Sequence, residues 1–187
     1  MNIQGNNESS IENIIGNILC NNNLTISTAE SCTGGLVAAK LISYAGISSS
    51  FLEGAVTYSN EAKIKRLGVK KDTLEKYGAV SEETAREMAE GIAKESSSNA
   101  SIATTGIAGP GGGTKEKPVG LVYIAVHLNG KTKVDKCNFD GNRNEIRNLA
   151  TNYAINMMIK ELKDNNYIIT AVFACIKNIQ FIQYNRC

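Results

Sequence analysis

The chain has 187 residues, of which 42% are apolar and 20% are charged, and its formal net charge is +2. This length and composition suit one globular domain with a sizeable buried core. The scattered basic residues argue against a nucleic-acid surface, and the longest apolar run, residues 167–176, is too short to cross a bilayer. The polar start is unlike a secretory leader, so we expect a cytoplasmic protein without a membrane anchor.

Helical and strand-like segments alternate along most of the chain. Apolar residues at helical spacing predict helices after the turn that follows Ser31, in an amphipathic stretch that begins near Ser81, and at 10–20, 61–67 and 143–163. Segments rich in β-branched residues predict strands at 24–30, 51–58, 100–106, 121–128 and 131–139. The pattern predicts an α/β sandwich with helices on both faces of a mixed, mostly parallel sheet of about five strands.

Three further segments complete the expected organisation. The dipeptide Asn129-Gly130 predicts a hairpin between the last two strands, and residues 68–80 are expected to form a loop. We expect one domain over residues 1–165. Residues 166–187 fit neither the pattern nor the composition of the rest, and the sequence leaves their order open.

The first stretch with chemical potential is the turn after the first strand, where Ser31 and Cys32 are followed by Gly34 and Gly35. A hydroxyl at a strand-to-helix junction lies at the positive end of the helix dipole, where free backbone N–H groups can hold a developing oxyanion. The two glycines permit close approach of a substrate. The plain alternative is that Ser31 only caps the helix. Cys32 is the rival nucleophile, but no nearby histidine lowers its pKa, and we interpret it as a small buried residue.

Lys63 is the candidate general base. It lies in the first turn of a predicted helix, where the dipole disfavours a cation, and burial would lower its pKa further. A neutral lysine can take the proton of a serine hydroxyl, as in Ser-Lys hydrolases. The alternative is a solvated surface lysine, and Lys65 faces a different side of the helix. Tyr58, at the end of a strand, could stack on an aromatic ring or simply pack half-buried.

A glycine-rich loop follows the third strand at residues 106–113. Backbone N–H groups of such loops often bind phosphate, although this one has neither the ending of a P-loop nor the helix start of a dinucleotide fingerprint. A flexible surface loop is the alternative. Thr105 is either an extra hydroxyl in the site or a strand-end residue. Arg143 opens the last helix and could reach an anionic group, or pair with a neighbouring carboxylate.

The sequence predicts no metal site and no cofactor. Its single histidine, His127, has no nearby ligand partner, and the five cysteines form no CxxC pair. The odd number of cysteines favours a reducing compartment.

Together, these segments resemble the C-terminal domain family of the competence/damage-inducible protein CinA, in its stand-alone nicotinamide-nucleotide amidase form. The resemblance covers roughly residues 10–163. It rests on the stretches TAESCTGGLVA, VTYSNEAK, LGV, YGAVSEETAREMAEG, TGIAGPGGG, KPVG and a helix start of the form F-x-G-x-R-x-x-I-R.

The resemblance implies a three-layer α/β/α sandwich that hydrolyses the carboxamide of nicotinamide mononucleotide to nicotinate mononucleotide and ammonia, without a metal. By position, Ser31 is then the nucleophile, Lys63 the base and Thr105 a further catalytic residue. The implied substrate contacts are Tyr58, Cys32, Thr33, Gly34, Gly35, Gly106, Gly109, Gly111, Gly112 and Arg143.

Two features leave alternatives open. Asn142 stands where an acidic residue before the arginine is more usual, which leaves the orientation of Arg143 undecided. A non-catalytic nucleotide-binding or interaction module linked to competence or DNA damage is the alternative function, although such a module needs neither Ser31 nor Lys63. The expected partner is a small pyridine nucleotide, with a homo-oligomer possible.

Overall fold

The computed structural model describes residues 10–167, which form six α-helices and five strands. The helices are α1 Ile11–Asn21, α2 Leu36–Ile42, α3 Asn60–Leu67, α4 Lys71–Tyr77, α5 Glu82–Ser96 and α6 Arg143–Asp164, with a short 3-10 helix at Ile47–Ser49. The strands are β1 Ile26–Glu30, β2 Phe51–Val56, β3 Ala100–Gly106, β4 Leu121–Leu128 and β5 Lys131–Asn138.

The five strands form one sheet in the order β2-β1-β3-β4-β5. The interior strand β1 pairs in parallel with both β2 and β3, while β4 pairs antiparallel with β3 and with β5. Four strands therefore share one direction and only β4 opposes them. Asn129 and Gly130 both have positive φ, at 48° and 82°, as a tight hairpin turn between β4 and β5 requires. The predicted mixed sheet and its hairpin are confirmed.

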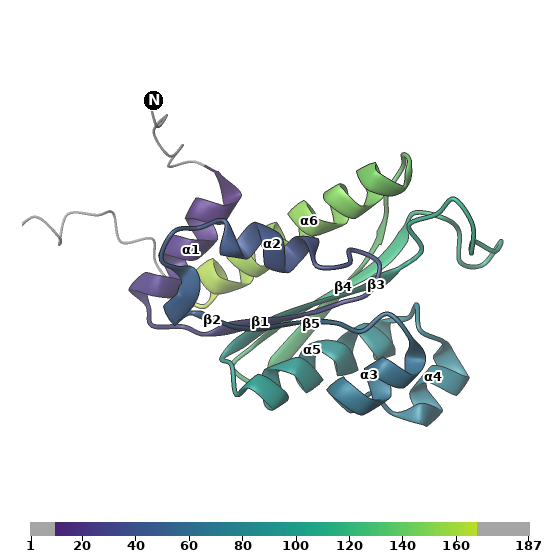
Figure 1. The fold of residues 1–187 in the computed structure, drawn as a ribbon, viewed down its shortest axis with the longest axis horizontal. Coiled ribbons are helices and arrows are strands. Elements are labelled where there is room, and N and C mark those ends of the chain that lie inside the picture. Colours follow the sequence, from purple (N-terminus) through teal and green to yellow (C-terminus); the bar gives the residue numbers. More distant parts are fainter. Residues whose placement is uncertain (1–9, 168–187) are drawn as a thin grey trace, which may run out of the picture.

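Helices cover both faces of the sheet, which gives the three layers that the family resemblance implies (Figure 1). Helices α1, α2 and α6 lie on one face, over a large apolar cluster that includes Ile18, Val37, Ile102, Val126 and Ile155. Helices α3, α4 and α5 lie on the other face, over a smaller cluster that includes Leu67, Leu74, Met88, Ile92 and Ala103.

Two local differences from the sequence prediction concern the second quarter of the chain. The segment expected to be a loop contains the short helix α4, whose Thr73 and Leu74 are buried. Strand β2 ends at Val56, two residues earlier than predicted, so that Thr57 and Tyr58 lie in the turn before α3. Most of the tail predicted at 166–187 lies outside the described residues.

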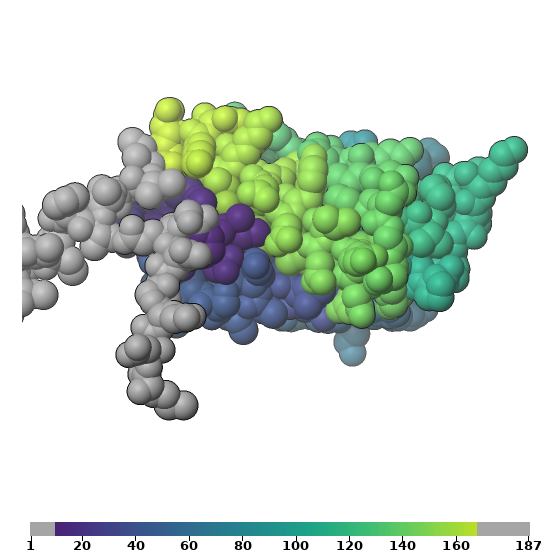
Figure 2. Space-filling model, turned by 90° about the horizontal axis from the view of Figure 1, so that it is seen from above, coloured from purple at the N-terminus to yellow at the C-terminus, as the bar shows by residue number. Residues whose placement is uncertain are grey.

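The parallel strands β1, β2 and β3 bring their carboxyl ends to one edge of the sheet. Three connections leave from this edge, at residues 31–35, 57–59 and 107–120. Figure 2 shows the last of them, in teal, projecting beyond the body of the molecule. In open α/β sheets this edge is the usual place for ligands. Within residues 10–167, none of the helices has the length and apolar character needed to cross a membrane.

Candidate active site

Ser31 follows the last residue of β1, between β2 and β3 at the carboxyl edge of the sheet. Its backbone N–H donates to the Thr104 carbonyl of β3 over 2.9 Å, which continues the parallel ladder by one residue. The chain then turns sharply into α2 through Gly34 and Gly35, with φ of 63° and 96°. Side chains with a Cβ rarely adopt these angles, so the two glycines make the tight turn possible. The side chain of Ser31 is only 9% exposed.

Lys63 lies against this serine, on the face of the sheet that α3, α4 and α5 cover. Its helix α3 is capped by Ser59, whose hydroxyl accepts from the Ala62 N–H over 3.1 Å. The Lys63 Nζ lies 3.2 Å from Ser31 Oγ, and it donates to the carbonyls of Thr57, over 2.8 Å, and Tyr58, over 3.4 Å. The predicted base and nucleophile are thus in hydrogen-bond contact.

The surroundings of Lys63 favour its neutral form. The residue is 1% exposed, and among residues 10–167 it makes no ion pair with a carboxylate. Burial lowers the pKa of the Lys63 ammonium, although the nearby Cys32 thiol acts in the opposite direction. A neutral amine has two N–H donors and one lone pair. A neutral Lys63 that keeps both donors on the carbonyls of Thr57 and Tyr58 has its lone pair available for the hydroxyl of Ser31.

Cys32 and Thr33, which follow the serine, point their side chains into the interior. Burial raises the pKa of the Cys32 thiol to about 12, so the thiol stays protonated at neutral pH. The Thr33 hydroxyl donates to Glu30 Oε2 over 2.6 Å and lies 2.7 Å from Thr104 Oγ1. The backbone N–H groups of Cys32 and Thr33 make no backbone–backbone hydrogen bond in the described part of the chain. Both lie against the sulfur of Cys32, which is a weak acceptor that an oxyanion can replace.

The sequence predicts Glu30 only as a strand residue, but in the structure its carboxylate accepts hydrogen bonds from several groups of the turn and of α2. Its carboxylate is 1% exposed and accepts from the N–H groups of Gly35, Val37 and Ala38 over 2.8–3.1 Å. The Gly35 N–H is therefore already occupied and cannot bind an oxyanion in this conformation. A carboxylate next to a glycine-rich helix start could have suggested this role from sequence, because such a helix lacks an N-cap side chain.

Thr105 lies beside the serine but is bonded elsewhere. Because Glu30 pairs with Thr104, the next residues, Ser31 and Thr105, emerge on the same face of the sheet. The Thr105 hydroxyl donates to the Ala79 carbonyl over 2.7 Å, in the corner between α4 and α5. No hydrogen bond joins it to Ser31 or Lys63 in the described part of the chain.

Arg143, at the start of α6, contacts both the glycine-rich loop and the turn that contains Tyr58. Its guanidinium donates to the Gly109 carbonyl over 2.7 Å and to the Tyr58 hydroxyl over 3.3 Å. Asn142, whose effect on this arginine the sequence left undecided, caps α6 in a capping box with Glu145. The cap leaves Arg143 free to point at the glycine-rich loop, and no carboxylate pairs with it among residues 10–167. Tyr58 is 64% exposed.

A second set of hydrogen bonds, from Lys117, holds the connection that contains the glycine-rich loop. Lys117 Nζ donates to the carbonyls of Tyr77 and Val80, each over 2.7 Å. Gly109 has φ of 78°, and a Cβ on it would lie only 2.6 Å from Val119 Cγ1, so the close approach requires glycine. The other predicted loop contacts differ in position: Gly106 ends β3, while Gly111 and Gly112 are exposed near the tip.

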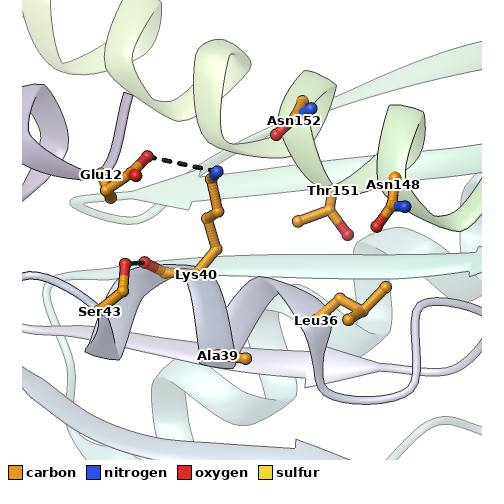
Figure 3. A pocket seen from close by; sticks show the side chains of 8 residues that line it. All are labelled: Glu12, Leu36, Ala39, Lys40, Ser43, Asn148, Thr151 and Asn152. Atoms are coloured by element: carbon orange, nitrogen blue, oxygen red, sulfur yellow. Dashed lines mark hydrogen bonds and ion pairs between the residues drawn. The ribbon is translucent and has the colours of Figure 1, made fainter. Parts of the chain in front are cut away.

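Two other features lie away from this edge. His127 shares a hydrogen bond of 2.8 Å with Thr132 Oγ1, and within residues 10–167 no group of three or more histidines, cysteines and carboxylates could hold a metal ion. A hollow of about 600 Å³ lies between α2 and α6, where Lys40 pairs with Glu12 over 3.4 Å (Figure 3). Neither Ser31 nor Lys63 lines it.

Comparison with known proteins identifies the family of the chain. The family model of the CinA C-terminal domain matches residues 8–162. A competence-damage inducible protein of Clostridium botulinum strain Langeland is 62% identical over 162 residues, and one of Clostridium acetobutylicum is 58% identical over 161 residues. These alignments cover 87% and 86% of this chain but only 40% and 39% of those relatives, so the chain spans about two fifths of their length.

Solved structures of similar size match nearly end to end. The competence/damage inducible protein CihA of Agrobacterium tumefaciens superposes with a TM-score of 0.79 at 42% identity, covering 86% of this chain and 98% of that one. A CinA superfamily protein of Escherichia coli gives a TM-score of 0.79 at 35% identity, covering 86% and 95%. With a matching family model over most of its length and close relatives in sequence and structure, the chain belongs to the CinA C-terminal domain family.

Proposed function

We propose that this protein is a serine amidohydrolase that converts nicotinamide mononucleotide to nicotinate mononucleotide and ammonia, with Ser31 as nucleophile and Lys63 as general base. The observation that carries the proposal is the 3.2 Å contact between Lys63 Nζ and Ser31 Oγ, with a lysine that is 1% exposed. A buried lysine without an acidic partner costs folding stability, and a group retained at such a cost is a candidate for a role in the chemistry of the site.

The reaction would proceed in two halves. Neutral Lys63 takes the proton of Ser31 as Oγ attacks the carboxamide carbon, and the tetrahedral oxyanion is held by the N–H groups of Cys32 and Thr33. Protonated Lys63 then gives its proton to the departing nitrogen, which leaves as ammonia. Water attacks the acyl-enzyme with Lys63 again as base, and Ser31 recovers its proton when nicotinate mononucleotide leaves.

The rim of the site supplies the groups that a nucleotide requires. Among residues 10–167, Arg143 donates only to neutral acceptors, a carbonyl and a phenol, so that a phosphate can replace them with a charge-assisted contact. The exposed ring of Tyr58 offers a stacking surface for the pyridine. Thr105, held by the Ala79 carbonyl, keeps the corner between α4 and α5 against the site rather than taking part in proton transfer.

The test is to incubate the purified protein with nicotinamide mononucleotide and to follow both binding, by calorimetry, and product, by chromatography. Formation of nicotinate mononucleotide by the wild type and its loss in Ser31→Ala, with binding retained in both, supports the proposal. Binding without turnover in the wild type would favour the non-catalytic module. Turnover of another amide but not of this one would keep the dyad and replace the substrate.

A further inference from the structure

The turn that contains Ser31 is held in place by the buried carboxylate of Glu30. The carboxylate of Glu30 receives four hydrogen bonds: from the Thr33 hydroxyl over 2.6 Å, the N–H groups of Gly35 and Val37 over 2.9 and 3.1 Å, and that of Ala38 over 2.8 Å. These donors span the turn and the first turn of α2. Glu30 therefore replaces the N-cap side chain that Gly35 lacks, and its negative charge lies at the favourable end of the helix dipole.

A positive charge holds the same turn from the other side. Arg147 of α6 donates to the Thr33 carbonyl through Nη2 over 2.8 Å and through Nε over 3.3 Å. The guanidinium also lies close to the backbone of Gly34, since a Cβ on that glycine would be 3.3 Å from Arg147 Nη2. Glu30 thus takes up the donors of the turn that point inward, and Arg147 takes up the carbonyl that points toward α6.

Three groups of the turn are bonded to neither Glu30 nor Arg147. Ser31 Oγ lies on the opposite face of the sheet, against Lys63, and the N–H groups of Cys32 and Thr33 have no backbone acceptor among the described residues and meet only the weakly accepting sulfur of Cys32. We propose that Glu30 and Arg147 are positioning residues that fix the turn in the one conformation in which Ser31 contacts Lys63 and these two N–H groups stay without a strong acceptor. The inference rests on Ser31 being the nucleophile, as in the proposed function, but not on the identity of the substrate.

The role requires a carboxylate rather than merely a polar side chain. All four groups around Glu30 are donors, so both of its oxygens accept. A glutamine in its place would put an NH2 group against at least one backbone N–H, and the turn would have to move to relieve that contact. A displacement of about 1 Å at a reacting atom costs on the order of 100-fold in rate.

The experiment measures the reactivity of Ser31 directly, with a fluorophosphonate probe and intact-mass detection. The probe forms a bond between Ser31 Oγ and phosphorus and expels fluoride, while Lys63 takes the proton, so that labelling needs the dyad but no amide substrate. Glu30→Gln is compared with Glu161→Gln, which removes another buried carboxylate (8% exposed) near the far end of α6. Both are assayed below the onset of their melting curves.

We expect the maximal labelling rate of folded Glu30→Gln to fall about 100-fold, with the half-saturating probe concentration and the pH midpoint unchanged. Glu161→Gln should label like the wild type. Labelling of folded Glu30→Gln within about threefold of the wild type would overturn the inference, as would an equal fall in both variants. If Glu30→Gln does not fold, Arg147→Gln decides: a reduced maximal rate supports the inference, and an unchanged rate overturns it.

Failure of the proposed function would look different. Wild type that is labelled at Ser31 but hydrolyses no nicotinamide mononucleotide has lost its proposed substrate, while the comparison of Glu30→Gln with the wild type stays valid. Wild type that the probe does not label has no activated serine, and both proposals fall.

Discussion

Lys63 is the proposed general base, and its environment gives a pH dependence of definite sign. Burial lowers its pKa from the ordinary lysine value. Because only the neutral amine can act as base, the active fraction grows as pH rises through this lowered pKa. We therefore expect kcat/KM to increase with pH from the acidic side to a plateau. A value of kcat/KM that does not change with pH, or that falls as pH rises, would exclude Lys63 as the base.

Lys63→Arg separates charge from basicity. Arginine keeps the positive charge but stays protonated at every accessible pH, so it cannot accept the proton of Ser31. We expect the rate to fall roughly 10²- to 10⁴-fold, the usual contribution of a general base. Lys65→Arg, two residues along the same helix, is the matched control and should retain full activity. Substantial turnover by Lys63→Arg would contradict the assignment.

Cys32 offers a second test at the residue scale, because it adjoins the nucleophile. Its pKa, raised to about 12 by burial, leaves the thiol protonated and unreactive at neutral pH. Cys32→Ala should keep the activity within about threefold and lose about 1 kcal/mol of unfolding free energy, as for other small buried groups. The rate is measured by ammonia release and the stability by urea unfolding. An inactive but folded Cys32→Ala would transfer the role of nucleophile to the thiol.

The sequence singles out Ser31 and Lys63, but it does not predict the contacts that hold the turn after Ser31. Ser31 and Lys63 could be singled out because Ser31 follows a strand before a glycine-rich turn, Lys63 stands in the first turn of a helix, and the family resemblance implies both. The contacts of Thr33 could not be predicted, since alternation along β1 does not tell which way a residue points after the strand ends. Arg147 enters the sequence analysis only as the last residue of the F-x-G-x-R-x-x-I-R stretch, and its contact with Thr33, 114 residues away in sequence, depends on how α6 packs against α2.

At the scale of the elements, the helix caps are the features that sequence predicts best. Ser81 was expected near the start of α5, and its hydroxyl accepts from the Thr84 N–H over 3.2 Å. Ser81→Ala should lower the unfolding free energy by about 1 kcal/mol. Ser10, the N-cap of α1 without a side-chain cap bond, provides the control, and Ser10→Ala should change stability by only a few tenths of a kcal/mol. Equal losses in urea unfolding would contradict the role of the cap.

The helix α4 shows where element prediction fails. Its seven residues contain one large aliphatic side chain, Leu74, and end at the tyrosine before Gly78, so no period of 3.6 residues can be recognised. The helix depends on contacts made after folding: Glu87 of α5 accepts from the Lys70 N–H and the Thr73 hydroxyl, each over 2.8 Å. Such tertiary contacts leave no local pattern in the sequence.

At the scale of the whole molecule, the site is assembled from segments that meet only at the carboxyl edge of the sheet. The number of strands and their mostly parallel direction could be predicted, because alternating helices and strands favour parallel pairing. The meeting of the glycine-rich loop, the turn at Tyr58 and the start of α6 could not, since it depends on the order β2-β1-β3 and on the packing of α6. Arg143 bridges all three segments.

Loss of this bridge should weaken substrate binding more than turnover. Arg143→Ala removes the charge proposed to hold the phosphate, and a charge-assisted hydrogen bond of about 1.5–3 kcal/mol corresponds to a rise in KM of roughly tenfold or more. The value of kcat should change little. Arg86→Ala removes an arginine of α5 that donates to the Thr132 carbonyl and to the Glu82 carboxylate. This control should leave both KM and kcat unchanged. A fall in kcat at constant KM would place Arg143 in the chemical step instead.

The central claim, a covalent route through Ser31, is tested most directly by trapping with hydroxylamine. Purified protein is given nicotinamide mononucleotide with and without hydroxylamine, and ammonia, nicotinate mononucleotide and the corresponding hydroxamate are measured. We expect the wild type to release ammonia and to form hydroxamate at the expense of the acid, and Ser31→Ala to form none of the three. Ammonia release that persists in Ser31→Ala, or no release by the wild type, would contradict the account.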